Sequence, residues 1–276
     1  MSAPEQRRAV GQVKEVTSLA NPIVKDIKAL ALKKFRDEQH AFMAEGLKLI
    51  IDALDLGWSI KTLVFAKAGI GTPAVEKVAA RTVAAGGLVL EVSEKVLAAI
   101  TRRDNPQMVV GVFTQKYLPL KDIRPTGNDV WVALDRVRDP GNLGTVIRTI
   151  DAVGAKGLIL VGDTTDPFSL ETVRATMGSI FRCAVHSAPN LAQTLQEQYA
   201  HYRLYGGAAG AAQKLEEIQL SSIWGVVLGS EAHGISQEVE ALLHGTFRID
   251  RARASEAESL NVAVAAGVIL HYWSTV

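Results

Sequence analysis

The sequence is short of cysteine and of long apolar segments, and each shortage excludes a class of protein. Cys183 is the single cysteine among 276 residues, which excludes an internal disulfide framework and fits a reducing cytoplasm. The longest uncharged apolar run, residues 260–270, is too short to span a bilayer. Residues 1–12 lack the apolar core of a signal peptide. We therefore expect a cytoplasmic protein with no membrane partner.

Net charge and aromatic residues are also scarce, which limits what can be inferred about partners. Thirty lysines and arginines against 29 aspartates and glutamates leave a formal net charge of +1, so any basic surface must be local. Aromatic residues make up only 6% of the chain, and no aromatic platform for single-stranded nucleic acid is expected. The 48% of hydrophobic and 21% of charged residues are typical of a globular protein.

The first half alternates helices with strands and begins with a basic cluster. Helices are predicted at 45–56 and 73–84, and strands at 61–66, 88–92 and 105–114, which together predict a small α/β sandwich. The basic residues near the start are separated by apolar ones: Lys25, Lys28, Lys33, Lys34 and Arg36. This cluster alone is compatible with a solvated helix face and with a surface for a nucleic-acid backbone.

Prolines, a glycine and charged residues cluster at 116–128 and indicate a domain boundary. We expect a first domain over 1–116, a linker over 117–128 and a second domain over 129–276. In the second domain, apolar strands alternate with helices, which predicts a parallel sheet covered on both faces. The strands are expected at 130–134, 157–161, 181–186, 203–208, 223–228 and 246–250, and the helices at 142–153, from about 170, at 190–199 and at 262–270. Ligands of such sheets bind at the carboxyl ends of the strands.

The segment 135–149 follows the first of these strands. Asp139-Pro140-Gly141 is typical of a turn, and Asn142 suits the N-cap position of the next helix. Arg148 then projects from the second helical turn. A capping asparagine and a solvated arginine would explain this segment without any function.

The segment 226–235 is an apolar strand that ends in small and charged residues. Gly229 and Gly234 allow a ligand to approach the backbone closely. Glu231 stands at the end of a buried strand and needs a partner. His233 is expected to be an ordinary loop residue rather than a metal ligand, because no second histidine, cysteine or carboxylate stands at metal-ligand spacing. We expect no metal.

The segment 246–273 joins a strand to the last helix through an arginine-rich loop that contains Arg248, Arg251 and Arg253. Ser259 and Asn261 open the helix, whose small apolar residues allow close packing within the fold or across a dimer interface. Core packing explains the alanines and valines but not the two polar residues at the helix entrance.

Taken together, in this order and spacing, these segments resemble the signature of the SpoU (TrmH) family of the SPOUT methyltransferases. The resemblance rests on DPGNLGTVIRT (139–149), LGSEAHGIS (228–236) and SLNVAVAAGVIL (259–270), with a subsidiary match at RATMGSIFR (174–182). In the first half, SLANPIVK (18–25) and KKFRDEQHAFMAEGLKLI (33–50) resemble the L30e-like substrate-binding domain of these enzymes.

The resemblance implies a fold, a reaction and a set of partners. The fold is an L30e-like α/β sandwich followed by a SPOUT parallel-sheet domain with a deep trefoil knot, assembled as a homodimer through the catalytic domain. The activity is methyl transfer from S-adenosylmethionine to a ribose 2′-hydroxyl of RNA, which is both the RNA hallmark and the nucleophile. A two-domain chain of this kind favours large-subunit ribosomal RNA, with transfer RNA as the alternative.

The resemblance also assigns the site residues. The catalytic residues are Arg148, Asn142, Glu231, Ser259 and Asn261. The cofactor lies against Leu228, Gly229, Ser230, Ile249, Asp250 and Leu260. RNA contacts fall to Lys25, Lys33, Lys34, Arg36, Arg136, Arg138, Arg251 and Arg253. Where the family commonly has Ile-Pro-Met, this chain has Ile249-Asp250-Arg251, a departure that bears on cofactor affinity and pocket polarity.

Two other classes of protein are alternatives to this interpretation. A catalytically silent RNA-binding factor for ribosome assembly would fit the departure at Asp250 and Arg251, but the five catalytic positions argue against it. A nucleotide-dependent oxidoreductase on a doubly wound sheet would need a glycine fingerprint and a ribose-binding carboxylate, which the chain lacks.

Overall fold

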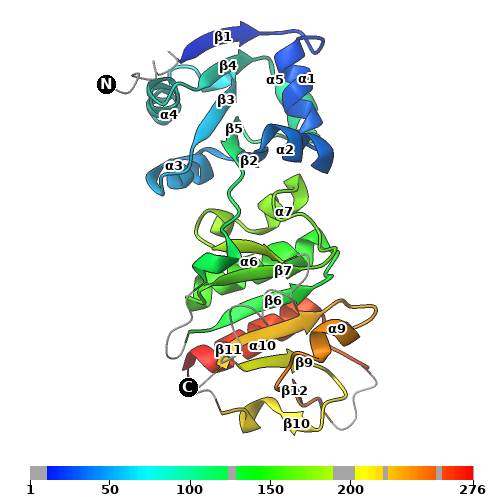
Figure 1. Cartoon of the computed structure of the whole chain (residues 1–276). Coiled ribbons are helices and arrows are strands. Elements are labelled where there is room, and N and C mark those ends of the chain that lie inside the picture. Colours follow the sequence, from blue (N-terminus) through cyan, green and yellow to red (C-terminus); the bar gives the residue numbers. More distant parts are fainter. Residues whose placement is uncertain (1–10, 124–128, 189–202, 220–222, 253–256, 276) are drawn as a thin grey trace, which may run out of the picture. The chain divides into compact units, whose positions relative to one another are not determined.

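The chain divides into two compact units. In the computed structural model, residues 11–123, 129–188, 203–219, 223–252 and 257–275 are described (Figure 1). The first unit contains Met1–Gln115 together with Phe168–Arg174, and the second contains Lys116–Pro167 and Ala175–Val276. A short segment from the second half of the sequence is therefore part of the first unit.

The first unit is built on a five-stranded sheet with the order β1-β4-β3-β5-β2. Its strands are β1 (Gln12–Val16), β2 (Ala41–Glu45), β3 (Ile60–Ala66), β4 (Leu88–Val92) and β5 (Val109–Thr114). β1, β4 and β3 run parallel, whereas β5 runs antiparallel to β3 and β2. The strand predicted at 105–114 begins only at Val109, and residues 105–108 form a loop before it.

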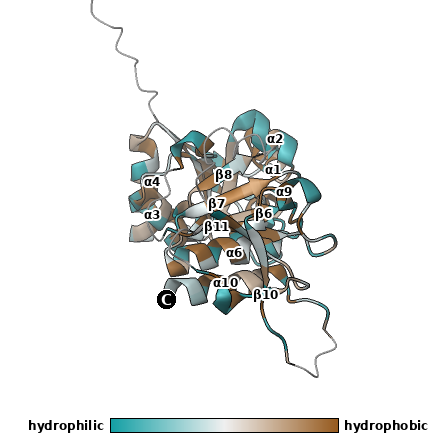
Figure 2. Ribbon diagram, turned by 60° about the horizontal axis from the view of Figure 1, so that its bottom comes forward, coloured by the Kyte–Doolittle hydropathy of each residue, from teal (hydrophilic) through white to brown (hydrophobic). Residues whose placement is uncertain are grey.

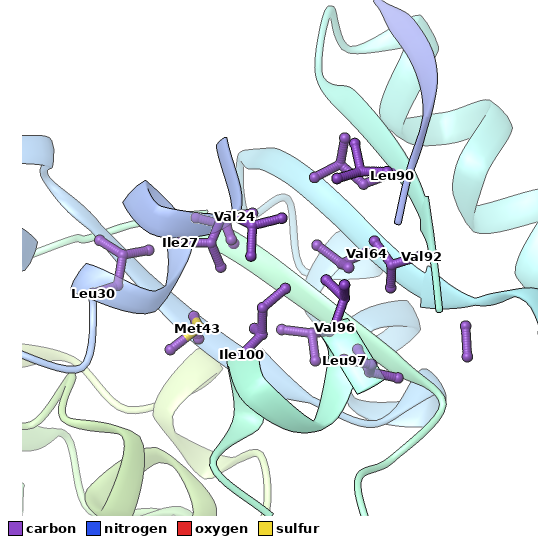
Figure 3. Packing of buried hydrophobic residues seen from close by; sticks show 14 of the residues in the cluster. Val24, Ile27, Leu30, Met43, Val64, Leu90, Val92, Val96, Leu97 and Ile100 are labelled. Carbon is purple, nitrogen blue, oxygen red and sulfur yellow. The ribbon is translucent and has the colours of Figure 1, made fainter. Parts of the chain in front are cut away.

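Five helices accompany this sheet: α1 (Pro22–Ala29), α2 (Lys33–Gln39), α3 (Leu47–Asp55), α4 (Pro73–Ala84) and α5 (Glu94–Thr101). The Asn21 side chain starts α1 by accepting a hydrogen bond from the Ile23 N–H at 2.9 Å, and Pro22 takes the first helical position. Val24 and Ile27 of α1 are buried with Val96 and Ile100 of α5 in one apolar cluster (Figure 3). The predicted α/β sandwich is therefore present.

The segment Phe168–Arg174 completes the first unit. The Phe168 ring is buried 4.8 Å from that of Phe42, and Leu170 joins the apolar cluster. Arg174 donates from Nε to the Glu45 carboxylate at 3.1 Å and from Nη2 to the Thr101 carbonyl at 2.6 Å. Because the Glu45 side chain is only 3% exposed, its charge depends on this guanidinium.

The Arg174→Met substitution is expected to destabilise the first unit by about 3 kcal/mol, because it leaves the buried Glu45 carboxylate with Arg103, at 3.8 Å, as its remaining charged partner. Amide hydrogen exchange of a β2 peptide, followed by mass spectrometry, measures the local opening free energy. The double variant Glu45→Gln/Arg174→Met removes the charge as well and is expected to recover part of the loss. Unchanged β2 exchange in the single variant would contradict the assignment.

The second unit is built on a seven-stranded sheet with the order β10-β12-β9-β11-β6-β7-β8, and every neighbouring pair is parallel. The strands are β6 (Trp131–Asp135), β7 (Gly157–Val161), β8 (Val185–Ala188), β9 (Arg203–Gly207), β10 (Gln213–Lys214), β11 (Ile223–Gly229) and β12 (Gly245–Arg248). The predicted parallel sheet is confirmed.

Both faces of this sheet are covered. Helices α6 (Pro140–Val153) and α10 (Val262–Thr275) pack against each other (Figure 2). A second apolar cluster combines Ala133, Ile159 and Val227 of the sheet with Ile123 and with Val239 of α9 (Gln237–Glu240). Among the helices of the described ranges, none has both the length and the apolar character needed to cross a membrane.

Two predictions for the second unit had other outcomes. A strand was expected at 181–186, but a 3₁₀ helix, η3 (Ser179–Phe181), occupies its start and β8 begins at Val185. The left-handed backbone of Met177 and Gly178 turns the chain after α7 (Leu170–Ala175), and the Cys183 N–H then donates to the Ser179 carbonyl at 2.9 Å. The helix expected at 190–199 lies outside the described residues.

Candidate active site

Helix α6 begins immediately after the loop that follows β6. The Asp139 side chain is the N-cap and accepts a hydrogen bond from the Asn142 N–H at 2.6 Å, with Pro140 at the first helical position. The prediction that Asn142 caps the helix, after a turn at Asp139-Pro140-Gly141, was wrong. A carboxylate followed by proline is itself a strong helix start, so the helix begins two residues earlier. The Asn142 side chain is thereby free for other contacts.

The Asn142 side chain links three segments that are far apart in the sequence. Its Nδ2 donates to Glu231 Oε1 at 2.5 Å, and its Oδ1 accepts from Asn261 Nδ2 at 3.0 Å. Asn261 in turn accepts from the Ala263 N–H at 2.9 Å and so caps the start of α10. Asn142 is half-buried, whereas Glu231 and Asn261 are exposed. The structure brings together three of the five predicted catalytic residues and supplies the partner expected for Glu231.

Arg148 stands apart from this cluster. It follows Asn142 by six positions on α6, so its side chain leaves the helix about 120° around the axis from Asn142. Its side chain is exposed, and within the described part of the chain no hydrogen bond or ion pair joins it to Glu231 or to another residue. Ser259 is also exposed and lines the cavity described below.

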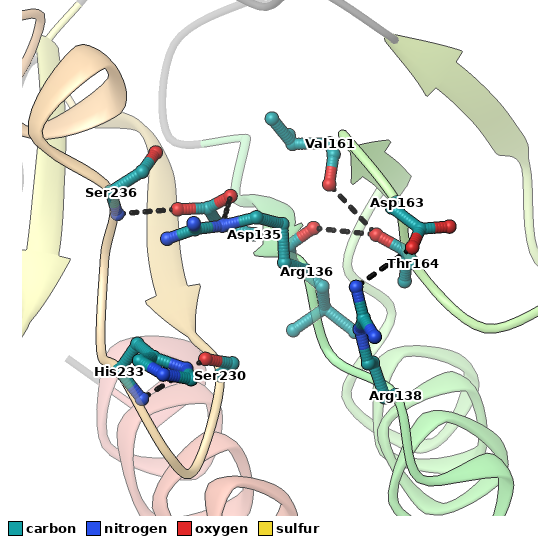
Figure 4. A network of polar contacts seen from close by, with 10 residues as sticks. Asp135, Arg136, Arg138, Val161, Asp163, Thr164, Ser230, His233 and Ser236 are labelled. Carbon is teal, nitrogen blue, oxygen red and sulfur yellow. Dashed lines mark hydrogen bonds and ion pairs between the residues drawn. The ribbon is translucent and has the colours of Figure 1, made fainter.

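A buried carboxylate anchors the loop that carries Glu231. Asp135, at the end of β6, accepts from the Ser236 N–H at 2.6 Å and from Arg136 Nε at 3.1 Å (Figure 4). These hydrogen bonds stabilise the charge of a side chain that is almost fully enclosed. Arg138 points to Asp163 instead, at 2.8 Å, on the solvent side of the loop. The hydrogen bonds of Asp135 thus connect the end of β6 to the loop after β11.

The loop after β11 is a tight turn that requires glycine. Ser230 and Gly234 exchange backbone hydrogen bonds of 3.1 and 2.8 Å, and Gly234 has a left-handed φ of 64°. A Cβ added to Gly229 would lie 2.0 Å from the Gly234 carbonyl carbon. His233 is exposed in this turn, where its N–H donates to Ser230 Oγ at 3.2 Å. No group of potential metal ligands occurs among the described residues.

A cavity of about 290 Å³ opens beside this turn, at the carboxyl ends of β9, β11 and β12 and the start of α10. Five of the six residues predicted to hold the cofactor line it: Leu228, Gly229, Ser230, Ile249 and Leu260. Asp250 does not line it. Its carboxylate points to Lys214 Nζ at 2.7 Å and to Arg248 Nε at 3.0 Å. The hydrogen bond from Lys214 is the main cause that lowers the pKa of Asp250.

Sequence reasoning missed one wall of this cavity. Gly207 at the end of β9 lines the cavity together with Ala208 and Ala209, which follow this strand, and Arg248 lines it from β12. The run of small residues at 206–212, directly after a parallel strand, was a usable signal for them.

The basic residues expected to contact RNA have different environments. Lys25, Lys33 and Lys34 are exposed in the first unit. Arg36 is only 3% exposed and donates from Nη1 to the Leu30 carbonyl at 2.8 Å, so its assignment to RNA is corrected to a structural role between α1 and α2. In the second unit, Arg251 lines the cavity and donates to the Ala257 carbonyl, while Arg253 lies outside the described residues.

Comparison with known proteins identifies the family. The model of the SpoU rRNA methylase family matches residues 129–271, and that of the MRM3-like substrate-binding domain matches 21–111. The chain belongs to the SpoU rRNA methylase family. The family and the enzyme class expected from the sequence are thus confirmed, and the SpoU match spans the cavity and the Asn142 cluster.

One named relative and two solved structures match nearly the whole of this chain. A 23S rRNA (guanosine(2553)-2′-O)-methyltransferase of Bacillus subtilis, RlmP, is 30% identical over 94% of this chain and 99% of its own. An AdoMet-bound rRNA methyltransferase of Sinorhizobium meliloti is 54% identical, with a TM-score of 0.88 over 95% of this chain and 97% of that one. AviRb of Streptomyces viridochromogenes, in complex with AdoMet, is 25% identical, with a TM-score of 0.82 over 92% and 97% of the two chains.

In this SpoU methylase, Gly229→Ala is expected to displace the 230–234 turn and weaken cofactor binding at least tenfold, because the added Cβ meets backbone that cannot yield cheaply. Calorimetric titration with S-adenosylmethionine measures the effect. Gly69→Ala, in the first unit, is the control, because a Cβ there makes only ordinary contacts of 3.5 Å or longer and the position has no left-handed backbone. Equal affinity of the two variants would show that the turn does not form the cavity wall.

Proposed function

We propose that the protein transfers a methyl group from S-adenosylmethionine to a ribose 2′-hydroxyl of large-subunit ribosomal RNA, with the cofactor in the cavity beside Gly229. The observation that carries the proposal is the Asn142–Glu231–Asn261 cluster, whose Glu231 lines a cavity at the carboxyl ends of parallel strands. Both relatives quoted above with an RNA in their names are rRNA methyltransferases, and one of them acts on 23S rRNA.

The residues of the cavity suit this cofactor. Leu228, Ile249 and Leu260 offer apolar surface for a planar adenine ring, and the turn at Gly229 presents backbone donors and acceptors. The cavity volume of about 290 Å³ is at the small end of the usual range for ligand pockets. When bound, S-adenosylmethionine supplies an electrophilic methyl group on a sulfonium whose leaving thioether is neutral.

The residues around the cavity position the ribose. A guanidinium keeps its charge in proteins, so Arg148 is not a general base. Its role in the proposal is to orient the ribose and stabilise the developing alkoxide, directly or through a neighbouring phosphate. Asn142 and Asn261 hold Glu231 and the entrance of α10 in place, and Ser259 offers a hydroxyl at the cavity wall.

A homodimer through the catalytic domain is part of the proposal. Val264 and Val268 lie one helical turn apart on α10 and are 53% and 40% exposed, which forms an apolar stripe on its outward side. A second copy packed on α6 and α10 would cover this stripe. Because Arg148 makes no hydrogen bond or ion pair with its own Asn142 cluster in the described part of the chain, we assign it to the cavity of the second copy.

RNA binding by exposed basic residues completes the proposal. RNA is held by Lys25, Lys33 and Lys34 of the first unit, whose residues 21–111 match a substrate-binding domain model, and by arginines near the cavity. The basic residues lie on exposed surface, where they suit phosphate contacts. The trefoil knot, the cytoplasmic location and the choice of ribosomal over transfer RNA remain predictions.

Arg148→Ala is expected to lower methyl transfer about 100-fold or more, the loss typical of removing one charge-stabilising donor. Labelled methyl from S-adenosylmethionine is followed into unmodified total RNA, which is separated by size and digested to nucleosides. Label recovered as a 2′-O-methylnucleoside from 23S rRNA supports the proposal. Arg203→Ala, at the amino end of β9, is the matched control and should retain wild-type activity.

Label in the transfer-RNA fraction would support the methyltransferase activity but contradict ribosomal RNA as its substrate. No label together with no cofactor binding would favour the silent assembly factor. Retention of activity in Arg148→Lys would contradict a need for the planar guanidinium, because lysine keeps the charge but loses the fork.

Mixing subunits tests whether Arg148 acts in the cavity of the second copy. Equal co-expression of Arg148→Ala and Glu231→Ala chains gives mixed dimers as half of the population. If Arg148 acts on the partner, each mixed dimer keeps one intact site, and about one quarter of wild-type activity returns. Activity no higher than that of either parent variant would place Arg148 in its own cavity. Sedimentation of the same samples checks that dimers form.

A further inference from the structure

The loop that closes one side of the cavity crosses over the end of β12. β12 lies between β9 and the short edge strand β10. Residues 208–212 connect β9 to β10 and must therefore pass over the carboxyl end of β12. Ala208 and Ala209 of this loop line the cavity, and the Ala208 N–H donates to the Phe247 carbonyl at 2.8 Å. The position of this loop sets the width of the cavity on that side.

Arg248 binds this loop through its guanidinium group. It stands at the end of β12, lines the cavity, and donates from Nη1 to the carbonyl oxygens of Ala211, at 2.8 Å, and Ala212. One guanidinium nitrogen therefore binds two consecutive carbonyls of the crossing loop. Hydrogen bonds from a charged donor are stronger than neutral ones, and they satisfy loop carbonyls that have no strand partner.

Asp250 orients that guanidinium. Its Oδ1 accepts from Arg248 Nε at 3.0 Å, and its Oδ2 accepts from Lys214 Nζ at 2.7 Å. Lys214 belongs to β10, the strand to which the crossing loop leads. The carboxylate thus connects Arg248 to the β10 end of the crossing loop, and the same contacts hold its pKa below the usual value.

We propose that Asp250 is a positioning residue for cofactor binding: it orients Arg248, and Arg248 holds the 208–212 loop as a wall of the cavity. This inference rests on the proposed function, which places S-adenosylmethionine in that cavity. Asp250 stands where the family commonly has proline, and a proline has no carboxylate to orient an arginine. The wall is held here by an ion-paired network that belongs to this chain.

The network should affect binding more than folding. The side chains of Asp250 and Lys214 are about half exposed, and ion pairs in such positions contribute little to the stability of a fold. A cavity wall that is not held in place must be ordered when the ligand binds, and this ordering lowers affinity. A large loss of affinity with a small loss of stability is therefore the signature of the positioning role.

The test is calorimetric titration of the full-length protein with S-adenosylmethionine, beside its thermal unfolding. Asp250→Asn is expected to weaken binding about tenfold, the loss typical of one charge-assisted hydrogen bond, with the melting temperature nearly unchanged. The KM for the cofactor should rise while kcat at saturating cofactor stays the same. Asp250→Glu, which keeps the carboxylate, should recover most of the affinity.

Lys156→Met is the matched control. It removes a comparable ion pair, with Asp129 at 3.4 Å, at the amino ends of β6 and β7, away from the cavity. It should bind the cofactor as the wild type does. Wild-type affinity in Asp250→Asn, or a loss that Lys156→Met shares, would overturn this inference alone. Absence of binding by the wild-type protein would overturn the proposed function and this inference with it.

Discussion

The parallel direction of all seven strands in the second unit is the constraint on which its site depends. Parallel strands deliver every following loop to the same edge of the sheet, so segments some 90 to 120 residues apart meet there. The Asn142 side chain uses this convergence, because a single amide both donates to Glu231 and accepts from Asn261. A sheet of mixed direction would send at least one of these loops to the opposite edge.

A buried carboxylate stabilises the place where these loops meet. Asp135 is buried beside the loop after β11, and its carboxylate accepts hydrogen bonds from the Ser236 N–H and from the Arg136 side chain. An enclosed carboxylate without such donors would be costly, so the loop and the charge stabilise each other. The Asp250 network acts differently, because Asp250 and Lys214 are about half exposed and Arg248 is the member that binds the loop carbonyls. Asp135 holds the turn beside the cavity, and Asp250 orients the arginine that holds the 208–212 loop.

Much of this arrangement could be predicted from the sequence, and the failures share a physical cause. Apolar strands followed by polar segments located the edge of the sheet at which the cavity lies, because that pattern is local, whereas the resemblance to the SpoU family assigned five of its lining residues. The N-cap assignment of Asn142 was wrong because Asp139 and Asn142 are both good capping residues, and only the geometry decides between them. Arg36 was assigned to the surface because charged residues are rarely buried, yet the Leu30 carbonyl provides an internal acceptor. Long-range partners of this kind leave no periodic signal.

The segment Phe168–Arg174 gives the first unit a boundary that does not follow the linear sequence. The chain leaves this unit after Gln115, returns at Phe168 and leaves again after Arg174. A ribosome that has made only the first 115 residues has therefore not yet made the phenylalanine and arginine that complete this unit. Recombination that exchanges the N-terminal half between related genes would also separate Glu45 from its own Arg174. The two halves are thus bound to evolve together, although their sequences resemble separate modules.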